Sequence, residues 1–225
     1  MKTAFITPLS SELRHFTAGL EVHGYVKQHR EINGYHYDFL EDGSFCTQAG
    51  HGKTEYAIKA VSKIEAAGSA DLLVCLGACG GLHGELSVGD IVVATETVEH
   101  DYKERFEPGP APVFSGYEQV LPGLVELNLT NVVFGRIASG DEDIVDRSRA
   151  EQIAKEFESI AVAWEGAGGA RAARHLGIPF LEVRVVTDMA HADAPGDFKA
   201  NLQLGMQNLA RFCMGPLRDS LNSLK

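Results

Sequence analysis

Acidic residues that directly follow apolar runs are the first feature of this sequence that could carry chemistry. Asp188 comes after "FLEVRVVT", a run rich in β-branched residues, and Glu165 comes after "IAVAW". Two carboxylates held near each other push their pKa values apart, and such a pair can divide the roles of acid and base. Glu12, in the segment "LSSEL", is of a type that is usually a solvated helix residue. The residues alone leave open whether Glu165 and Asp188 share an active site.

A glycine-rich segment, "CLGACGGLHGELSVGD", is the second such feature. It matches neither the G-x-G-x-x-G pattern of dinucleotide-binding proteins nor the P-loop pattern with its Lys and Ser or Thr. A run of small residues lets backbone N–H groups approach a ligand closely, but the same glycines can simply make tight turns. The segment argues against a nucleoside triphosphate site and leaves these two interpretations open.

Alternating strand and helix patterns must position these residues. Apolar runs predict strands over 2–7, 71–77, 89–100, 132–139, 160–165 and 180–187, and an antiparallel meander over 29–49 around the Asp42-Gly43 turn. The helical period predicts helices over 9–23 (Ser10 or Ser11 near its N-cap, Gly24 after it), 54–68, 146–157, 167–177, and a C-terminal helix carrying Phe198, Leu202, Met206, Leu209, Phe212 and Leu217. Alternation of this kind predicts an α/β fold with three αβα layers, in which helices flank a central mixed sheet.

The ends of these strands indicate where a ligand would bind. In open α/β sheets, ligands collect beyond the carboxyl ends of the strands. Asp188 and Glu165 each follow a strand, and so do Gly77 and the segment 139–141. We therefore expect four strands to direct polar or glycine-rich ends toward one place.

Length and charge narrow the classes of function. The 225 residues are expected to form one domain, 1–225, and the net charge of -11 would repel a nucleic-acid backbone. Pro8 and Ser10-Ser11 interrupt the first apolar stretch before a signal peptide could form, and no stretch is long and apolar enough for a membrane span. We therefore expect a cytoplasmic protein without nucleic-acid or membrane partners.

The cysteines are best explained as packing residues. Cys46, Cys75 and Cys79 lie in or beside apolar segments, where free thiols behave as small hydrophobic groups. Cys75 and Cys79 form a C-x3-C pair, but no second Cys or His pair at ligand spacing accompanies it. No metal site and no cofactor are predicted.

Several segments together resemble the superfamily of purine nucleoside phosphorylases and nucleosidases, and within it the 5'-methylthioadenosine/S-adenosylhomocysteine nucleosidases. The resemblance rests on "LSSEL", "LGACGGLHGELSVGDIVVATETVEHD", "IASGDEDIV", "AWEGAG" and "EVRVVTDMAHAD" with a later Phe198, in that order along nearly the whole chain. "HDYKERFEPGPAPVF" and "VVTDMAHADAPGDFKANL" are closer to the plant-type branch. A nucleoside phosphorylase-like fold is implied.

The resemblance also implies a reaction, hydrolysis of an N-glycosidic bond that releases adenine. Asp188 would protonate the leaving base, Glu12 would activate the water, and Glu165 would hold the ribose hydroxyls. An oxocarbenium-like transition state needs such an acid on the leaving side and a carboxylate toward the water. A homodimer is implied as well. The residues that would bind the substrate are Ala78, Gly80, Asp143, Ile144, Ala163, Trp164, Glu165, Arg184, Thr187 and Phe198.

Two departures from the family pattern leave the base and the 5' substituent open. Asp143 stands where the family has an aromatic residue that stacks on the purine, and Trp164 stands where it has Met. Trp164 could supply part of the lost apolar contact, or the pocket could favour a different nucleoside. The segment "TPLSSELR" lacks the Gly-Asp-Pro of the phosphorylases, and Arg14 in it is expected to be a surface charge, so hydrolysis is favoured over phosphorolysis. A futalosine-type hydrolase or a non-catalytic purine-binding protein would also fit this sequence.

Overall fold

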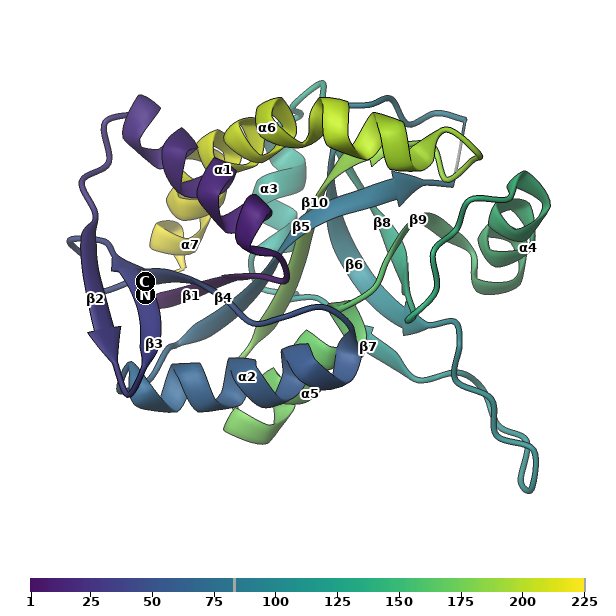
Figure 1. Cartoon of the computed structure of the whole chain (residues 1–225), viewed down its shortest axis with the longest axis horizontal. Coiled ribbons are helices and arrows are strands. Elements are labelled where there is room, and N and C mark those ends of the chain that lie inside the picture. The colour runs from purple at the N-terminus through teal and green to yellow at the C-terminus, as the bar shows by residue number, and fades with distance from the viewer. Residues whose placement is uncertain (83, 225) are drawn as a thin grey trace.

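The structure is a computed structural model that describes residues 1–82 and 84–224. Its centre is a ten-stranded mixed sheet with helices on both faces (Figure 1). This arrangement confirms the α/β architecture predicted from the sequence. The strands are β1 (Thr3–Thr7), β2 (Gln28–Ile32), β3 (Tyr35–Phe39), β4 (Phe45–Gln48), β5 (Leu72–Gly81), β6 (Ile91–Glu99), β7 (Val113–Ser115), β8 (Val132–Ser139), β9 (Ser159–Ala163) and β10 (Phe180–Asp188).

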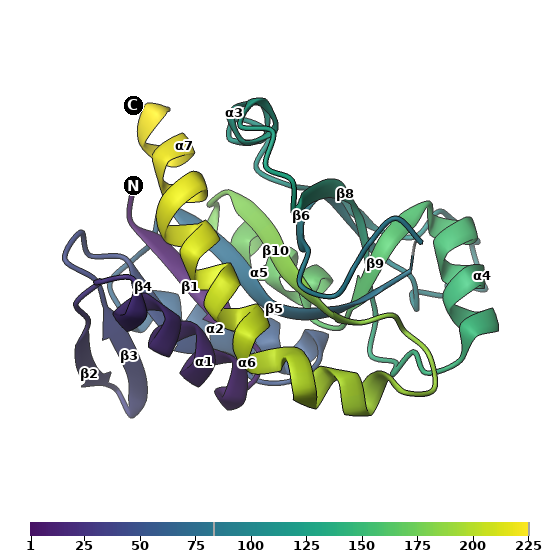
Figure 2. The same ribbon diagram turned by 90° about the horizontal axis from the view of Figure 1, so that it is seen from above.

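Two pairs of helices cover the sheet. α1 (Ser10–Val22) and α6 (Ala194–Phe212) pack on one face, and α2 (Lys53–Ala66) and α5 (Gly166–Leu176) pack on the other (Figures 1 and 2). Gly19 lets α1 approach α6 closely, because a Cβ there would lie 2.9 Å from the Cβ of Ala210. The other helical segments are α3 (Leu121–Glu126), α4 (Arg147–Phe157), and η1 (Cys213–Leu217) and α7 (Arg218–Ser223), which continue α6.

The sheet contains a closed circuit of five strands. β5 pairs with β10, β10 with β6, β6 with β8, β8 with β9, and β9 returns to β5. The remaining path runs from β5 through β1 and β4 to the antiparallel hairpin of β3 and β2. Within this circuit each strand has a neighbour on both sides over at least part of its length.

β5 changes its partner along its length, and this change creates an opening. Its residues 72–75 pair with β1, and Gly80 and Gly81 pair with β9 on the same side. Between these stretches, the described residues provide no strand partner for β5 on that side. The backbone N–H of Ala78 is therefore available to a side chain or a ligand.

The local predictions were mostly confirmed, with one correction. The turn at Asp42-Gly43 is present, with Gly43 at φ 84°, and Asp146 caps α4 by accepting a hydrogen bond from the N–H of Arg149. Ser10 and Ser11 lie near the N-cap of α1, as predicted, and the N-cap itself is Leu9. The N–H of Leu9 donates to Glu12 at 3.0 Å, so an acidic side chain satisfies the helix end in place of a hydroxyl.

The correction concerns the strand predicted over 71–77. β5 runs on to Gly81, because its glycines and Cys79 pair with β10 and β9 instead of turning. The helix α3 and the short strand β7 were not predicted. All four cysteines are buried free thiols, in agreement with the packing role expected for three of them. No helix within the described residues is long and apolar enough to cross a membrane.

Candidate active site

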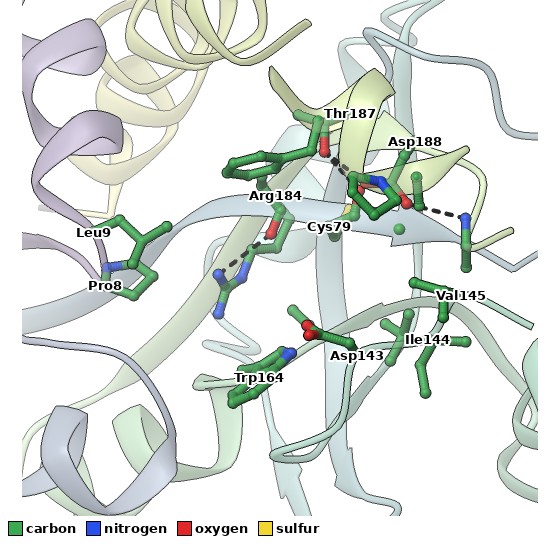
Figure 3. Close-up of a pocket in the computed structure, with 18 of the residues that line it drawn as sticks. Pro8, Leu9, Cys79, Asp143, Ile144, Val145, Trp164, Arg184, Thr187 and Asp188 are labelled. Atoms are coloured by element: carbon green, nitrogen blue, oxygen red, sulfur yellow. Dashed lines mark hydrogen bonds between the residues drawn. The ribbon is translucent and has the colours of Figure 1, made fainter. Parts of the chain in front are cut away.

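A cavity of about 350 Å³ opens beside the stretch of β5 that lacks a strand partner (Figure 3). Elements from both ends of the chain contribute to its wall, including the loop after β1, the centre of β5, the end of β10 and the start of α6. The structure brings all of the predicted site residues together around it: Glu12, Ala78, Gly80, Asp143, Ile144, Ala163, Trp164, Glu165, Arg184, Thr187, Asp188 and Phe198.

Glu12 is a buried carboxylic acid, not the solvated helix residue that its isolated context suggests. Only 2% of its surface is exposed, and it reaches the cavity from the first turn of α1. Oε1 accepts a hydrogen bond from the N–H of Ala78 at 2.8 Å, and Oε2 accepts the one from Leu9. Burial, with a smaller contribution from the nearby Glu165 carboxylate, raises the pKa of Glu12 to about 7. At neutral pH this group can both accept and release a proton.

Asp188 lies at the opposite wall of the cavity, where β10 ends (Figure 3). The register against β5 shifts between Val186 and Asp188, so Thr187 is the extra residue of a β-bulge. A bulge turns the following side chain away from its regular direction. The carboxylate accepts hydrogen bonds from the N–H of Ala190 at 3.0 Å and from the hydroxyl of Thr187 at 2.9 Å. Burial nevertheless raises the pKa of Asp188 above its ordinary value.

Glu165 occupies the N-cap of α5, directly after β9, and 3% of it is exposed. Oε1 accepts a hydrogen bond from the N–H of Gly52 at 3.2 Å. Oε2 lies 3.4 Å from both terminal nitrogens of Arg184, which is 1% exposed. These contacts are long for hydrogen bonds, so Glu165 keeps the capacity to accept bonds from a ligand in the cavity.

His51 belongs to the site and was missed in the sequence. Its Nδ1 lies 3.2 Å from Oε1 of Glu165, and its ring stacks on Trp164 with centroids 4.1 Å apart. The hydrogen bond to Glu165 raises the pKa of His51, although burial acts in the opposite direction. The segment "AGHG" directly follows β4, whose first three residues are buried. The same strand-end criterion that pointed to Asp188 and Glu165 could therefore have found it.

Apolar side chains form much of the rest of the wall. Trp164 and Asp143 lie side by side on the wall that faces Thr187 and Asp188 (Figure 3). Phe198, from α6, is half-buried and lines the cavity as well. An apolar wall with carboxyl groups at separate points suits a flat, mostly apolar ligand that carries a few hydroxyl and nitrogen groups.

Three other residues noted in the sequence lie outside the cavity lining. Gly77 is inside β5 and not at its end. Ser139 fixes the turn that carries Glu165, because its hydroxyl donates to the Trp164 carbonyl at 2.7 Å and accepts from the N–H of Ala167 at 2.9 Å. Arg14 is exposed, as expected. Among residues 1–82 and 84–224, no group of three or more His, Cys, Asp or Glu is placed to hold a metal ion.

Comparison with known proteins gives one family. Residues 2–217 match the model of the phosphorylase superfamily. Over 168 residues the chain is 30% identical to the 5'-methylthioadenosine/S-adenosylhomocysteine nucleosidase of Shewanella oneidensis, covering 68% of this chain and 70% of the relative.

Solved structures share the whole fold. An S-adenosylhomocysteine nucleosidase from Streptococcus pyogenes, solved in complex with 5-methylthiotubericidin, superimposes with a TM-score of 0.83 at 26% identity, covering 97% of each chain. A futalosine hydrolase of Helicobacter pylori superimposes with a TM-score of 0.82 at 24% identity, over 97% of this chain and 98% of the other.

Proposed function

This chain belongs to the phosphorylase superfamily, and we propose that it is a nucleosidase that hydrolyses the N-glycosidic bond of a purine nucleoside. The substrate is of the 5'-methylthioadenosine or S-adenosylhomocysteine type, and the products are adenine and a ribose derivative. The nucleosidase relatives support this assignment. One observation carries it: two buried carboxyl groups with raised pKa values, Glu12 and Asp188, line one cavity.

Each carboxyl group has a separate role in this reaction. Asp188 donates a proton to the purine as the bond to the ribose carbon breaks, because a purine anion is a poor leaving group. Glu12 accepts a proton from the water that attacks the same carbon. Glu165 binds the ribose hydroxyls, and the apolar wall that includes Trp164 and Phe198 holds the base and the 5' substituent. The electron pair of the broken bond stays on the base, and water supplies the new hydroxyl.

The polar groups of the cavity favour hydrolysis over phosphorolysis. A phosphate co-substrate would need cationic groups free to bind it. Arg184, the buried cation of the lining, is already engaged with Glu165 and with Glu182, whose Oε1 is 2.8 Å from its Nε. His51 is engaged with Glu165, and Lys199, the remaining basic residue of the described lining, is exposed to solvent. The futalosine hydrolase neighbour makes a nucleoside with a larger 5' substituent the second candidate substrate class.

We also propose that the enzyme is a homodimer that works in the cytoplasm. The loop between β6 and β7 extends away from the body of the protein (Figure 1), and Tyr102 and Phe106 in it and Val113 directly after it are exposed, which favours a partner surface. Four buried free thiols are typical of a reducing compartment. Light scattering coupled to size-exclusion chromatography tests the dimer by its mass.

The proposed function is tested by incubating the protein with a panel of nucleosides, with and without phosphate. We expect adenine and a free ribose derivative from 5'-methylthioadenosine and S-adenosylhomocysteine in phosphate-free buffer. A ribose 1-phosphate product, formed at a rate that rises with phosphate, would assign the protein to the phosphorylases. Binding of adenine nucleosides without any release of base would show that the protein binds purine nucleosides but does not hydrolyse them.

A further inference from the structure

A fully buried carboxylate outside the cavity lining controls the position of Arg184. Glu182 lies on β10 and has no exposed surface. Its Oε1 accepts a hydrogen bond from Nε of Arg184 at 2.8 Å, and its Oε2 accepts one from the hydroxyl of Thr97 at 2.6 Å. Both oxygens therefore have a strong donor, as a buried ionised carboxylate requires.

Gly166 leaves the space that the side chain of Glu182 occupies. A Cβ on Gly166 would lie 2.1 Å from Oε2 of Glu182, so no other residue fits there while Glu182 keeps its place. Gly166 is the first residue of α5. The positive end of that helix therefore lies against the carboxylate.

Arg184 sits between Glu182 and the two carboxylates of the cavity, but not symmetrically. Its Nε is 2.8 Å from Glu182, whereas its terminal nitrogens are 3.4 Å from Glu165. The point that a Cβ on Gly77 would occupy is 2.6 Å from Nη1 of Arg184 and 2.8 Å from Oε1 of Glu12. Arg184 and Glu12 thus share the small gap above Gly77, and any shift of the guanidinium changes the field at Glu12.

We propose that Glu182 is a positioning residue for the hydrolysis: by binding Arg184 it holds the guanidinium charge back from Glu12 and Glu165 and keeps Glu12 a base strong enough to activate water. This inference rests on the proposed function. Glu182 does not touch the cavity, and it acts through Arg184 alone.

The charges that face Glu12 give the direction of the effect. Burial and the Glu165 carboxylate raise the pKa of Glu12, and Arg184 lowers it. His51 faces Glu12 too, and its charge acts in the same sense as that of Arg184. Burial raises the pKa of the Cys75 thiol beside Arg184 to about 12, so that group is neutral. Without Glu182, the charge of Arg184 would be balanced by Glu12 and Glu165 alone, and the pKa of Glu12 would fall.

The first experiment measures kcat/KM against pH for the wild type and for Glu182→Gln, which keeps the shape but not the charge. The acidic limb of the wild-type profile reports the ionisation of Glu12 in the free enzyme. We expect the variant's limb to lie about one pH unit lower, since an unshared guanidinium nearby depresses a carboxyl pKa by that order. The plateau rate falls as well, because a weaker base activates water less well.

Two further variants separate this effect from general damage. Glu96→Gln breaks the 2.6 Å ion pair between Glu96 and Arg136, which both lie outside the cavity lining. The acidic limb of this variant's kcat/KM profile should therefore coincide with that of the wild type. Thr97→Val keeps the charge of Glu182 but removes one of its two donors. We expect a smaller shift in the same direction, and this variant replaces Glu182→Gln if the latter fails to fold.

A measurement without substrate keeps the inference separate from the proposed function. The ¹³C signal of the Glu12 carboxyl group, identified by its loss in Glu12→Gln, is titrated in the wild type and in Glu182→Gln. We expect a lower midpoint in the variant whether or not the protein turns over nucleosides. Coincident midpoints, or coincident acidic limbs in all four proteins, would show that Glu182 only packs against Arg184 and would overturn the proposal.

Discussion

The hydroxyl of Thr187 donates a hydrogen bond to Oδ2 of its chain neighbour Asp188 at 2.9 Å, and the same hydroxyl lies 3.4 Å from the carbonyl oxygen of Cys79. Neighbours in a regular strand point to opposite faces, so this contact depends on the bulge at Thr187. Because this hydroxyl can turn toward either acceptor, it can form a hydrogen bond with Asp188 in both the ionised and the protonated state. It donates to the carboxylate, and it can turn to Cys79 and accept a bond once Asp188 is protonated.

Replacement of Asp188 by Asn tests the role of the general acid. Asn keeps the shape and a hydrogen-bond donor but cannot release a proton, so substrate should still bind while kcat falls by roughly two to four powers of ten. A nitrophenyl riboside, whose leaving group departs without protonation, should be affected much less if the cavity accepts it. Glu12→Gln should impair both substrates. Near wild-type turnover of adenine nucleosides by Asp188→Asn would show that Asp188 is not the general acid and only ends the strand.

The raised pKa of Glu12 predicts a pH-dependent cost in stability. The folded protein holds the proton of Glu12 up to about pH 7, whereas the unfolded chain releases it near the ordinary glutamate pKa of 4.5. The stability that comes from this proton is complete below the unfolded pKa and is lost as pH rises through 7. Glu12→Gln, which stays neutral, should gain about 3 kcal/mol over the wild type between pH 5 and pH 8.

Urea unfolding of both proteins at the two pH values measures this difference. A second comparison with Glu96→Gln, at a partly exposed carboxylate, should show no such gain. Equal changes in the wild type and in Glu12→Gln would mean that Glu12 titrates near its ordinary pKa in the folded protein.

Trp164 is predicted to hold the nucleoside through apolar contact. Its ring lines the cavity with His51 stacked against it. Trp164→Ala should raise KM and lower kcat/KM by the loss of a buried aromatic contact, on the order of 1 to 3 kcal/mol. Asp143→Phe places an aromatic ring on the same wall and should improve adenine nucleosides. If steady-state kinetics are unchanged in both variants, another part of the cavity holds the base.

Gly77 is predicted to be indispensable for the geometry of the site. A Cβ there would press on Arg184 and on Glu12 from less than 3 Å, and both are buried and bound on other sides. Gly77→Ala should therefore lower kcat/KM about a hundredfold, the usual effect of misplacing a reacting group by roughly 1 Å. Gly84→Ala is the matched control, since a Cβ on Gly84 meets no atom within 4 Å among the described residues beyond its chain neighbours. Circular dichroism confirms folding, and equal activity in the two variants would contradict the prediction.

The fold and the strand-end positions of Glu165 and Asp188 could be predicted because strands and their ends leave a clear signal in sequence, whereas the other predicted site residues were implied by the family resemblance. Glu165 and Asp188 each directly follow an apolar run. A carboxylate in that position indicates the carboxyl end of a strand, where ligands bind in an α/β sheet. Glu12 carries no such signal. Its burial depends on the N–H of Ala78, which is available because β5 changes partner far away in the sequence. The resemblance of "LSSEL" to a known family identified it, and local chemistry did not.

Residues that act through other residues could not be predicted. Glu182 lies in a run that alternates polar and apolar residues, and such a Glu normally faces solvent. It is buried because the circuit of strands closes around it. β6 brings Thr97 to one of its oxygens, and Arg184, two residues on in the same strand, reaches the other. The bulge at Thr187 likewise arises from the pairing of β10 with β5, and it cannot be predicted from the sequence of either strand alone.

The closed circuit of strands has a consequence for how the protein is made. β5 pairs with β10, which lies far along the chain from it. During synthesis, β10 therefore leaves the ribosome long after β5. Until then the apolar run "LLVCL" has one side without its final neighbour, and unpaired strands of this type associate with one another. We therefore expect chains cut before β10 to aggregate during synthesis instead of forming a smaller folded unit, and chaperone demand to peak while β10 is still inside the ribosome.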